Sequence, residues 1–357
     1  MRIEKTTPRL HTRILAPLLF LVFLGACDSA TDVEDRLLAK SVPSSSVSGN
    51  KGNLLASKDP MVLVSQKLQP YVKCINTVSS RVSAAKSRYL SWVKNKIKGP
   101  TCKERYISYA TYKLYSTTAC TTALLKANKK PPHLAKLEKA AAGFAQAVSR
   151  LKPLLDSAYL YYTTKAYKRD NCAKGKQLHP RLMATWEVAS GYDIALRQAV
   201  RSHNEKIQGW RLARIAKRYG LNHPRYYHRK IMAHAKESLA TMRRLFFSKG
   251  KARTGNELAD ARAATRRYGD LVEKAGGLSK AGVRVVGYTL YKIRAKALAK
   301  AFVEAINRKS KKKGYTRLQR RWLRSPTTGH LVKGSFARVL KRFNELIGAF
   351  NRVRFSA

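Results

Sequence analysis

The chain has 357 residues, with 73 Lys and Arg against 20 Asp and Glu, and a formal net charge of +53. Apolar residues make up 44% of it, which excludes a disordered basic tail and is enough to build a hydrophobic core. The composition therefore predicts a folded, very basic protein. Either it binds an anionic partner, or its charge only keeps it soluble.

The first 27 residues have the order of a bacterial lipoprotein signal. Basic residues precede an apolar run from Ile14 to Phe23, and the lipobox-like Leu24-Gly25-Ala26-Cys27 follows. This run is shorter than the roughly 20 residues that a spanning helix needs. We expect residues 1–26 to be removed and Cys27 to be lipidated, including palmitate. The alternatives are an uncleaved anchor and an ordinary signal peptide with an incidental cysteine.

This signal predicts a location in the cell envelope, facing the periplasm, with the choice between inner and outer membrane left open. Residues 27–58 are rich in Ser, Gly and Asn and predict a flexible tether of roughly 30 Å. Without residues 1–26 the net charge is +50. Because the lipid already anchors the protein, we expect the charge to serve recognition or orientation.

Residues 59–357 predict a single helical domain. A first helix from Asp59-Pro60 to near Lys98 has apolar residues spaced three and four apart. Thr101 and Glu104 form a capping-box pattern that predicts a second helix to about residue 127. A third helix carries apolar residues at the same spacing from Leu134 to Tyr162. A turn at 169–177 and a fourth helix follow, the helix running from His179-Pro180 to Tyr219 and stopping at Gly220.

The rest of the domain continues the same pattern. Helices are expected after Asn222-His223-Pro224, from Asn256 to Lys274, at 284–307 and after the capping residue Ser335. No stretch shows the alternation of a strand. We therefore predict an all-α fold, an antiparallel bundle or elongated array of about eight long helices.

Four cysteines remain once Cys27 is lipidated, and four cysteines allow three pairings. On the predicted second helix, Cys102 and Cys120 would lie about 27 Å apart, beyond the roughly 7 Å that a disulfide permits. Cys74, on the first helix, would lie more than roughly 30 Å from Cys102. We therefore predict the disulfides Cys74–Cys120 and Cys102–Cys172.

Four segments carry a resemblance to the YiiG-like bacterial lipoproteins, a family built on a domain of unknown function. They are KLQPYVKCINTVSSRVSAAKSRYLSW at 67–92, KGPTCKER at 98–105, YYTTKAYKRDNCAKGKQLH at 161–179 and SFARVLKRFNELIGAFN at 335–351. The resemblance implies an exported helical lipoprotein without an assigned enzyme activity, and cysteines at the places of Cys74 and Cys120. This chain departs from the family in being far more basic and in having Cys102 and Cys172.

Motifs for catalysis, metal binding and cofactor binding are absent from the sequence. His223, His228 and His234 lie five and six residues apart, which does not suit a zinc helix, and we interpret them as surface or capping residues. The carboxylates are scattered among Lys and Arg, which favours surface ion pairs over a glycosidase-like acid pair. We predict no catalytic residue, no metal and no cofactor, and hence a protein that is not an enzyme.

Tyrosines form two groups for which two interpretations stay open. Tyr106, Tyr109, Tyr112 and Tyr115 form the first, and Tyr161, Tyr162 and Tyr167 the second. Core packing is favoured over a groove whose rings stack on a polymer beside Lys113 or Lys165.

The densest charge run encloses Trp322 and lies near the C-terminus. We predict that it binds anions, and the alternative is a solvated loop. Its members are Lys309, Lys311, Lys312, Lys313, Arg317, Arg320, Arg321 and Arg324.

The expected partners are the membrane, through the N-terminal lipid, and an anionic lipid, lipopolysaccharide, an acidic polymer or an acidic protein. Export argues against nucleic acid. Two other functions stay open: an immunity or inhibitor lipoprotein that neutralises a toxin in the periplasm, and, in third place, an enzyme acting on envelope polymers.

Overall fold

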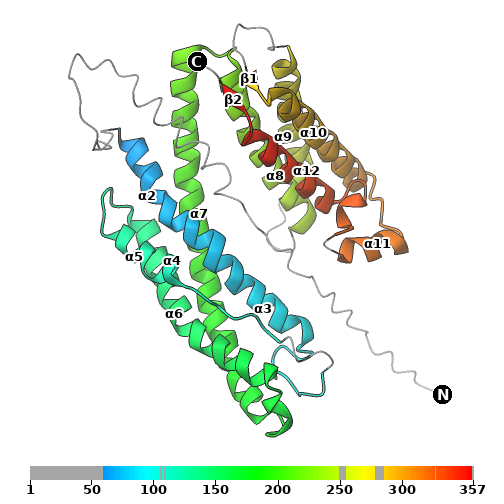
Figure 1. The fold of residues 1–357 in the computed structure, drawn as a ribbon. Coiled ribbons are helices and arrows are strands. Elements are labelled where there is room, and N and C mark those ends of the chain that lie inside the picture. The colour runs from blue at the N-terminus through cyan, green and yellow to red at the C-terminus, as the bar shows by residue number, and fades with distance from the viewer. Residues whose placement is uncertain are drawn as a thin grey trace, which may run out of the picture. The chain divides into compact units, whose positions relative to one another are not determined.

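A computed structural model describes residues 59–104, 107, 110–248, 255–277, 285–325 and 327–355 (Figure 1). The predicted signal peptide, the predicted lipidation site Cys27 and the predicted tether lie outside these residues. The chain divides into two compact units. In the described part, unit 1 comprises residues from Pro70 to Arg197, and unit 2 comprises residues 59–69 and those from Gln198 onward. Helices α2 and α7 contribute residues to both.

Helices make up nearly all the regular structure described in unit 1. The first helix is continuous through a π-helical turn, η1, that follows Cys74. The elements are α2 (Pro60–Cys74), η1 (Ile75–Ser79), α3 (Ser80–Trp92), α4 (Thr118–Thr121), α5 (Ala123–Asn128), α6 (Ala135–Thr163), η3 (Ala166–Lys168) and α7 (Ala173–Tyr219).

The core of unit 1 follows the predicted spacing of apolar residues. Every predicted core position from Tyr71 to Trp92 is at most 8% exposed, and those from Leu137 to Tyr162 on α6 are fully buried. The centre of the Tyr89 ring lies 5.4 Å from the ring centres of Trp92 and Trp186. Aromatic side chains from α3 and α7 therefore pack together in this core. The helical periodicity of both segments is confirmed.

The predicted second helix is wrong before Thr118, and only its last part is helical, as α4 and α5. One of the two hydrogen bonds of the capping box forms, because Glu104 accepts from the Thr101 N–H at 2.8 Å. No α-helix is described between residue 101 and Thr118. Cys102 has a left-handed backbone (φ 61°), which interrupts a helix at its first turn. The Trp92 indole donates to the carbonyl of Ala110 at 2.7 Å and ties the following segment to α3 instead.

Two other predicted helix ends are also corrected. The first helix stops at Trp92, not near Lys98. Helix α7 starts at Ala173 and includes Pro180, because Asp170 accepts the N–H groups of Cys172 and Lys174 at 3.0 Å and caps the helix upstream of the expected turn.

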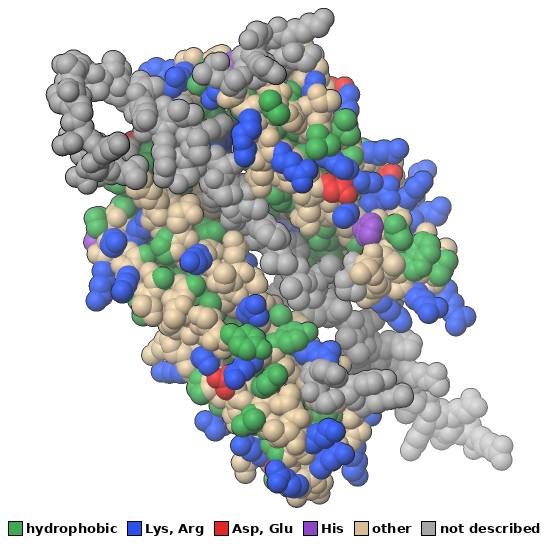
Figure 2. All heavy atoms as spheres, in the orientation of Figure 1, with side chains coloured by type: hydrophobic (Ala, Val, Ile, Leu, Met, Phe, Trp, Pro, Cys, Tyr) green, Lys and Arg blue, Asp and Glu red, His purple; other side chains and the backbone are tan. Residues whose placement is uncertain are grey.

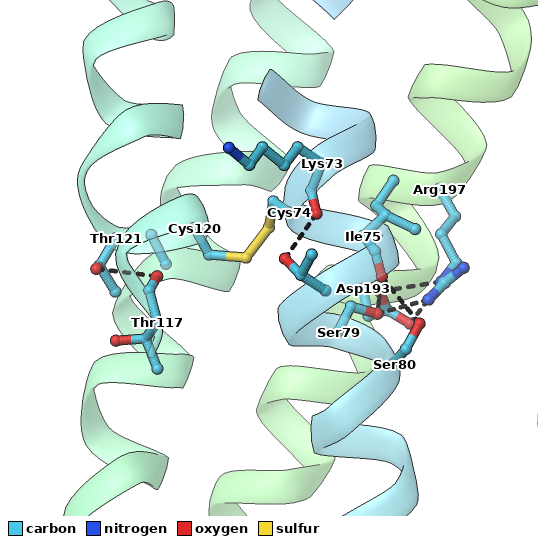
Figure 3. The surroundings of a disulfide bond; sticks show 12 residues. Lys73, Cys74, Ile75, Ser79, Ser80, Thr117, Cys120, Thr121, Asp193 and Arg197 are labelled. Atoms are coloured by element: carbon cyan, nitrogen blue, oxygen red, sulfur yellow. Dashed lines mark hydrogen bonds and ion pairs between the residues drawn. A yellow bond between two sulfur atoms is a disulfide. The ribbon is translucent and has the colours of Figure 1, made fainter. Parts of the chain in front are cut away.

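Two disulfides join the expected cysteine pairs. Cys74 bonds to Cys120 with a Cα–Cα distance of 4.8 Å, and Cys102 bonds to Cys172 with 5.6 Å. The predicted pairing is confirmed, although one step of its derivation was wrong, since Cys102 and Cys120 do not share a helix. Figure 3 shows the first bond joining the end of α2 to α4.

A polar cluster holds the π-helical turn on α7, as Figure 3 also shows. The Ser79 hydroxyl donates to Asp193 at 2.6 Å, and Arg197 donates to both oxygens of the same carboxylate at 2.9 and 3.0 Å. Ser79 is 2% exposed, so its hydroxyl needs this partner. The cluster therefore fixes η1 within unit 1.

In the described part of unit 2, α9 packs between α8 and α10, and α12 packs on α10 and α8. A two-residue antiparallel pair, Val285 opposite Phe355, corrects the expectation that the chain has no strand. The elements are α8 (Pro224–Phe247), α9 (Glu257–Gly276), β1 (Val285–Val286), α10 (Tyr288–Ser310), α11 (Arg317–Arg324), η5 (Gly329–Leu331), α12 (Phe336–Phe350) and β2 (Arg354–Phe355).

Several predicted helix ends in unit 2 are confirmed. Gly220 follows α7 with φ +81°, a conformation that favours glycine. His223 accepts from the Arg225 N–H at 3.2 Å as the cap of α8, and Ser335 accepts from the Arg338 N–H at 3.1 Å as the cap of α12. The all-α fold is thus confirmed. No helix among the described residues is apolar over a length that would cross a membrane.

The surface interpretation of His228 is wrong. His228 is 6% exposed, and its ring stacks on the Phe350 ring with centroids 4.0 Å apart. Nε2 donates to the Phe350 carbonyl at 3.3 Å, and the Tyr291 hydroxyl donates to the His228 carbonyl at 2.8 Å. His228 is therefore a core residue that joins α8, α10 and α12.

Candidate anion-binding surface

The predicted anion-binding run spans the end of α10, a turn and helix α11, all in unit 2. Arg308, one residue before the run, organises the turn. Its guanidinium donates to the carbonyls of Gly314 at 2.8 Å and Lys333 at 3.1 Å, and lies 4.6 Å from the centre of the Tyr315 ring. Arg308 thus stabilises the backbone of the turn that carries the other cations.

Close packing behind the turn makes it well defined. Gly334 has φ +70°, and a Cβ there would lie 2.8 Å from the Glu304 carbonyl oxygen and 3.0 Å from the Arg308 side chain. Burial raises the pKa of the Tyr315 hydroxyl, which stays protonated and donates to the Gly334 carbonyl at 3.4 Å. The turn between α10 and α11 is therefore held in a defined conformation, although its residues 311–314 are exposed to solvent.

Helix α11 begins with a complete capping box. Thr316 accepts from the Gln319 N–H, and the Gln319 side chain accepts from the Thr316 N–H, both at 3.2 Å. Arg320 donates to the Tyr315 carbonyl at 2.8 Å and ties the helix to the turn. Because this helix is only eight residues long, these contacts and its packing on η5 stabilise it.

The eight predicted anion-binding residues divide into two groups. Lys309 is half-buried with its ammonium 4.4 Å from the centre of the Phe246 ring, and Arg320 is bonded to the turn. The other six are exposed and make no ion pair or side-chain hydrogen bond with the described residues. We call these six the α11 basic patch: Lys311, Lys312, Lys313, Arg317, Arg321 and Arg324.

The patch has no acidic neighbour in the sequence, since residues 305–344 contain no Asp or Glu. Glu304 pairs with Arg338 at 3.1 Å, and Glu345 pairs with Arg342 at 2.7 Å. The nearest carboxylates along the chain therefore already have partners. In Figure 2, Lys and Arg side chains gather beside hydrophobic ones at the position of α11.

Helix α11 also presents apolar side chains beside the charges. At 100° per residue, its four arginines span an arc of about 100°. Leu318 lies about 60° beyond Arg321 at the edge of that arc, and Trp322 lies about 40° beyond Leu318. Leu318 is 54% exposed and Trp322 is half-buried. The combination of free cations with an exposed leucine is the distinctive feature of this surface.

The tyrosine groups give a weaker candidate in unit 1. Tyr161 and Tyr162 are buried, as core packing predicts, while Tyr112 and Tyr115 are exposed; Tyr106 and Tyr109 lie outside the described residues. A shallow hollow near the start of α7 is lined by residues that include Leu160, Tyr161, Asp170 and Lys174.

The polar groups of this hollow already serve the local structure. The Tyr161 hydroxyl donates to Asp170 at 2.7 Å, and this bond, with the helix N–H groups, holds the pKa of Asp170 below its ordinary value. The described residues also contain no group of three His, Cys, Asp or Glu placed to hold a metal ion. The α11 basic patch is therefore the stronger candidate.

Two residues of the surface were missed in the sequence. Arg308 precedes the charge run, and nothing in the sequence marks its guanidinium as a backbone ligand. Leu318 could have been found, because Thr316 and Gln319 match a capping box and predict an amphipathic helix for the eight residues that follow.

Residues 63–352 match the model of a family described as a protein of unknown function, DUF3829. The chain belongs to the DUF3829 family. It is similar to the uncharacterized protein YiiG of Escherichia coli (strain K12), with 26% identity over 306 residues that cover 83% of this chain and 81% of the relative. No solved structure matches the chain. The predicted likeness to a YiiG-like family of unknown function is thus confirmed, and the DUF3829 match names no activity.

Proposed function

We propose that the protein is a lipid-anchored, non-enzymatic envelope protein that binds an anionic envelope component through the α11 basic patch. The observation that carries this proposal is the six exposed cations of the turn and helix α11, which make no ion pair with any residue that the structure describes. The candidate components are an anionic lipid, lipopolysaccharide, an acidic polymer and an acidic protein. All four carry an excess of negative charge that could pair with the cations of the patch.

The energetics favour a surface of many charges over a single small anion. Each Lys or Arg near an anionic surface contributes about 1 kcal/mol. Six such side chains therefore give useful affinity only when they meet a dense array of negative charges together. Because the side chains are exposed, salt screens the attraction over about 10 Å at 0.1 M.

Lipidation at Cys27 would strengthen this binding without adding a contact. A patch tethered to the membrane meets a component of that membrane at an effective concentration in the millimolar range. An affinity too weak for a freely diffusing protein is then sufficient. This division of labour leaves anchoring to the lipid and recognition to the charge.

The test is a binding titration of the mature chain, residues 27–357, with Cys27→Ser to remove the lipid. The probes are heparin, a soluble polyanion, and vesicles containing phosphatidylglycerol. Replacing Lys311, Lys312 and Lys313 with Gln should weaken binding to at least one probe on the order of a hundredfold, from about 1 kcal/mol per charge. A tenfold rise in salt should weaken the unmodified chain more than this variant.

The matched control changes the net charge equally at another place. Lys126, Lys129 and Lys136 are exposed lysines of unit 1, and replacing them with Gln should have a much smaller effect. Equal losses in the two triple variants would show that net charge alone drives binding. That result, or the absence of binding to both probes, would refute the proposal.

A further inference from the structure

Leu318 is the feature of the α11 surface that charge alone does not explain. Binding a soluble polyanion needs cations, and an exposed leucine adds nothing to it. Yet Leu318 is 54% exposed in the first turn of α11, next to Arg321 and Trp322 on the helix surface. Leu331 on η5, which packs against α11, is 52% exposed as well.

This combination fits the boundary between lipid headgroups and acyl chains. Helices that lie in this layer place cations among the phosphates and apolar side chains a few ångströms deeper. An indole such as that of Trp322 suits the same layer, since it joins an apolar body to a polar N–H. An aqueous polyanion or the rim of an acidic protein offers no such apolar layer.

We infer that α11 docks on an anionic lipid layer, with the α11 basic patch on the phosphates and Leu318 at the boundary between headgroups and acyl chains. This inference rests on the proposed function and names the partner within it. The helix is only about 12 Å long, so it supplies one contact and not an anchor. That is enough when a lipid on Cys27 already holds the chain at the membrane.

The test separates the apolar contact from the charge. Leu318→Gln in the mature chain with Cys27→Ser should weaken binding to vesicles of phosphatidylglycerol and phosphatidylcholine roughly tenfold, as expected when about half a leucine leaves an apolar layer. Binding to heparin should stay within twofold. The matched control is Ile293→Gln on α10, whose side chain is 56% exposed and lies outside the patch; it should change neither.

Trp322 provides an independent readout. Phosphatidylglycerol with brominated acyl chains should quench part of the tryptophan fluorescence, and Trp322→Phe should abolish that part. Equal quenching before and after Trp322→Phe would overturn the inference, and so would a Leu318→Gln variant that binds vesicles like the parent chain.

The outcomes distinguish this inference from the proposed function. If the triple lysine variant loses binding to heparin and vesicles while Leu318→Gln loses neither, the patch binds anions but does not insert, and an acidic polymer or protein becomes the partner. If the triple variant loses neither, the proposed function itself fails. If the triple variant loses binding to heparin and to vesicles while Leu318→Gln loses binding to vesicles alone, the lipid assignment stands.

Discussion

Acid should destabilise unit 2 through His228. The ring is enclosed by Phe350, Tyr291 and Phe355, with centroid distances of 4.0, 4.8 and 5.5 Å. Desolvation by this burial is the main cause that lowers its pKa from 6.5 to about 3, and the neighbouring charge of Arg229 lowers it further. In the unfolded chain the same imidazole titrates near 6.5.

The sign of the effect follows from the protons bound in each state. Between pH 3 and 6.5 the unfolded chain holds a proton on His228 and the folded chain does not, so the free energy of unfolding falls as the pH falls. The stabilisation is complete above pH 6.5 and is lost progressively below it. For pKa values of 6.5 and about 3, lowering the pH from 7.5 to 5 costs about 2 kcal/mol.

The assay is urea unfolding of the chain and of a His228→Phe variant at a series of pH values. Phenylalanine keeps a ring against Phe350 but cannot be protonated, so the variant should lose about 2 kcal/mol less than the parent chain between pH 7.5 and 5. His133→Asn is the control, because His133 is exposed, and it should follow the parent curve. Parallel curves for the parent and His228→Phe would refute the reasoning.

Three further predictions concern stability, each measured by chemical unfolding. Replacing Cys74 and Cys120 with Ala opens a cross-link between residues 46 apart and should cost about 4 kcal/mol; a loss under 1 kcal/mol would contradict this. Asp193→Asn, which weakens the polar cluster on the π-helical turn, should cost about 2 kcal/mol, and no change would mean that the turn does not need it. Gly334→Ala should cost at least about 2 kcal/mol, because φ is positive and the new Cβ would meet the Glu304 carbonyl oxygen. Gly348→Ala is the control: it lies in open space on α12 and should stabilise the chain by about 0.5–1 kcal/mol. Similar effects at both sites would contradict the turn geometry.

Long helices with a repeated apolar face could be predicted from the sequence. The spacing of three and four from Tyr71 to Trp92 survives even the π-helical turn, and every one of these side chains is buried. The segment after Thr101 could not be predicted in the same way. Its local signal for a helix is genuine, but the left-handed backbone of Cys102 and the hydrogen bond from Trp92 override it.

The candidate site was predictable in charge but not in architecture. The run of cations is visible in the sequence, and the structure leaves seven of its eight members exposed, six of them without a side-chain bond to the described residues. Two contacts depend on the tertiary structure and could not be predicted. Lys309 lies over Phe246, which is far from it in sequence, and Arg308 donates to two carbonyls on the other side of a turn. His228 was misjudged for the same reason, because its aromatic neighbours come from other elements of unit 2.

The most direct test of the account is the salt dependence of heparin binding by residues 27–357 with Cys27→Ser. Each released counter-ion contributes to the slope of log affinity against log salt, so replacing Lys311, Lys312 and Lys313 with Gln should lower the magnitude of that slope by roughly two to three. The control triple at Lys126, Lys129 and Lys136 should leave the slope nearly unchanged. Equal slopes for the parent chain and the patch variant would contradict the claim that the α11 basic patch binds anions.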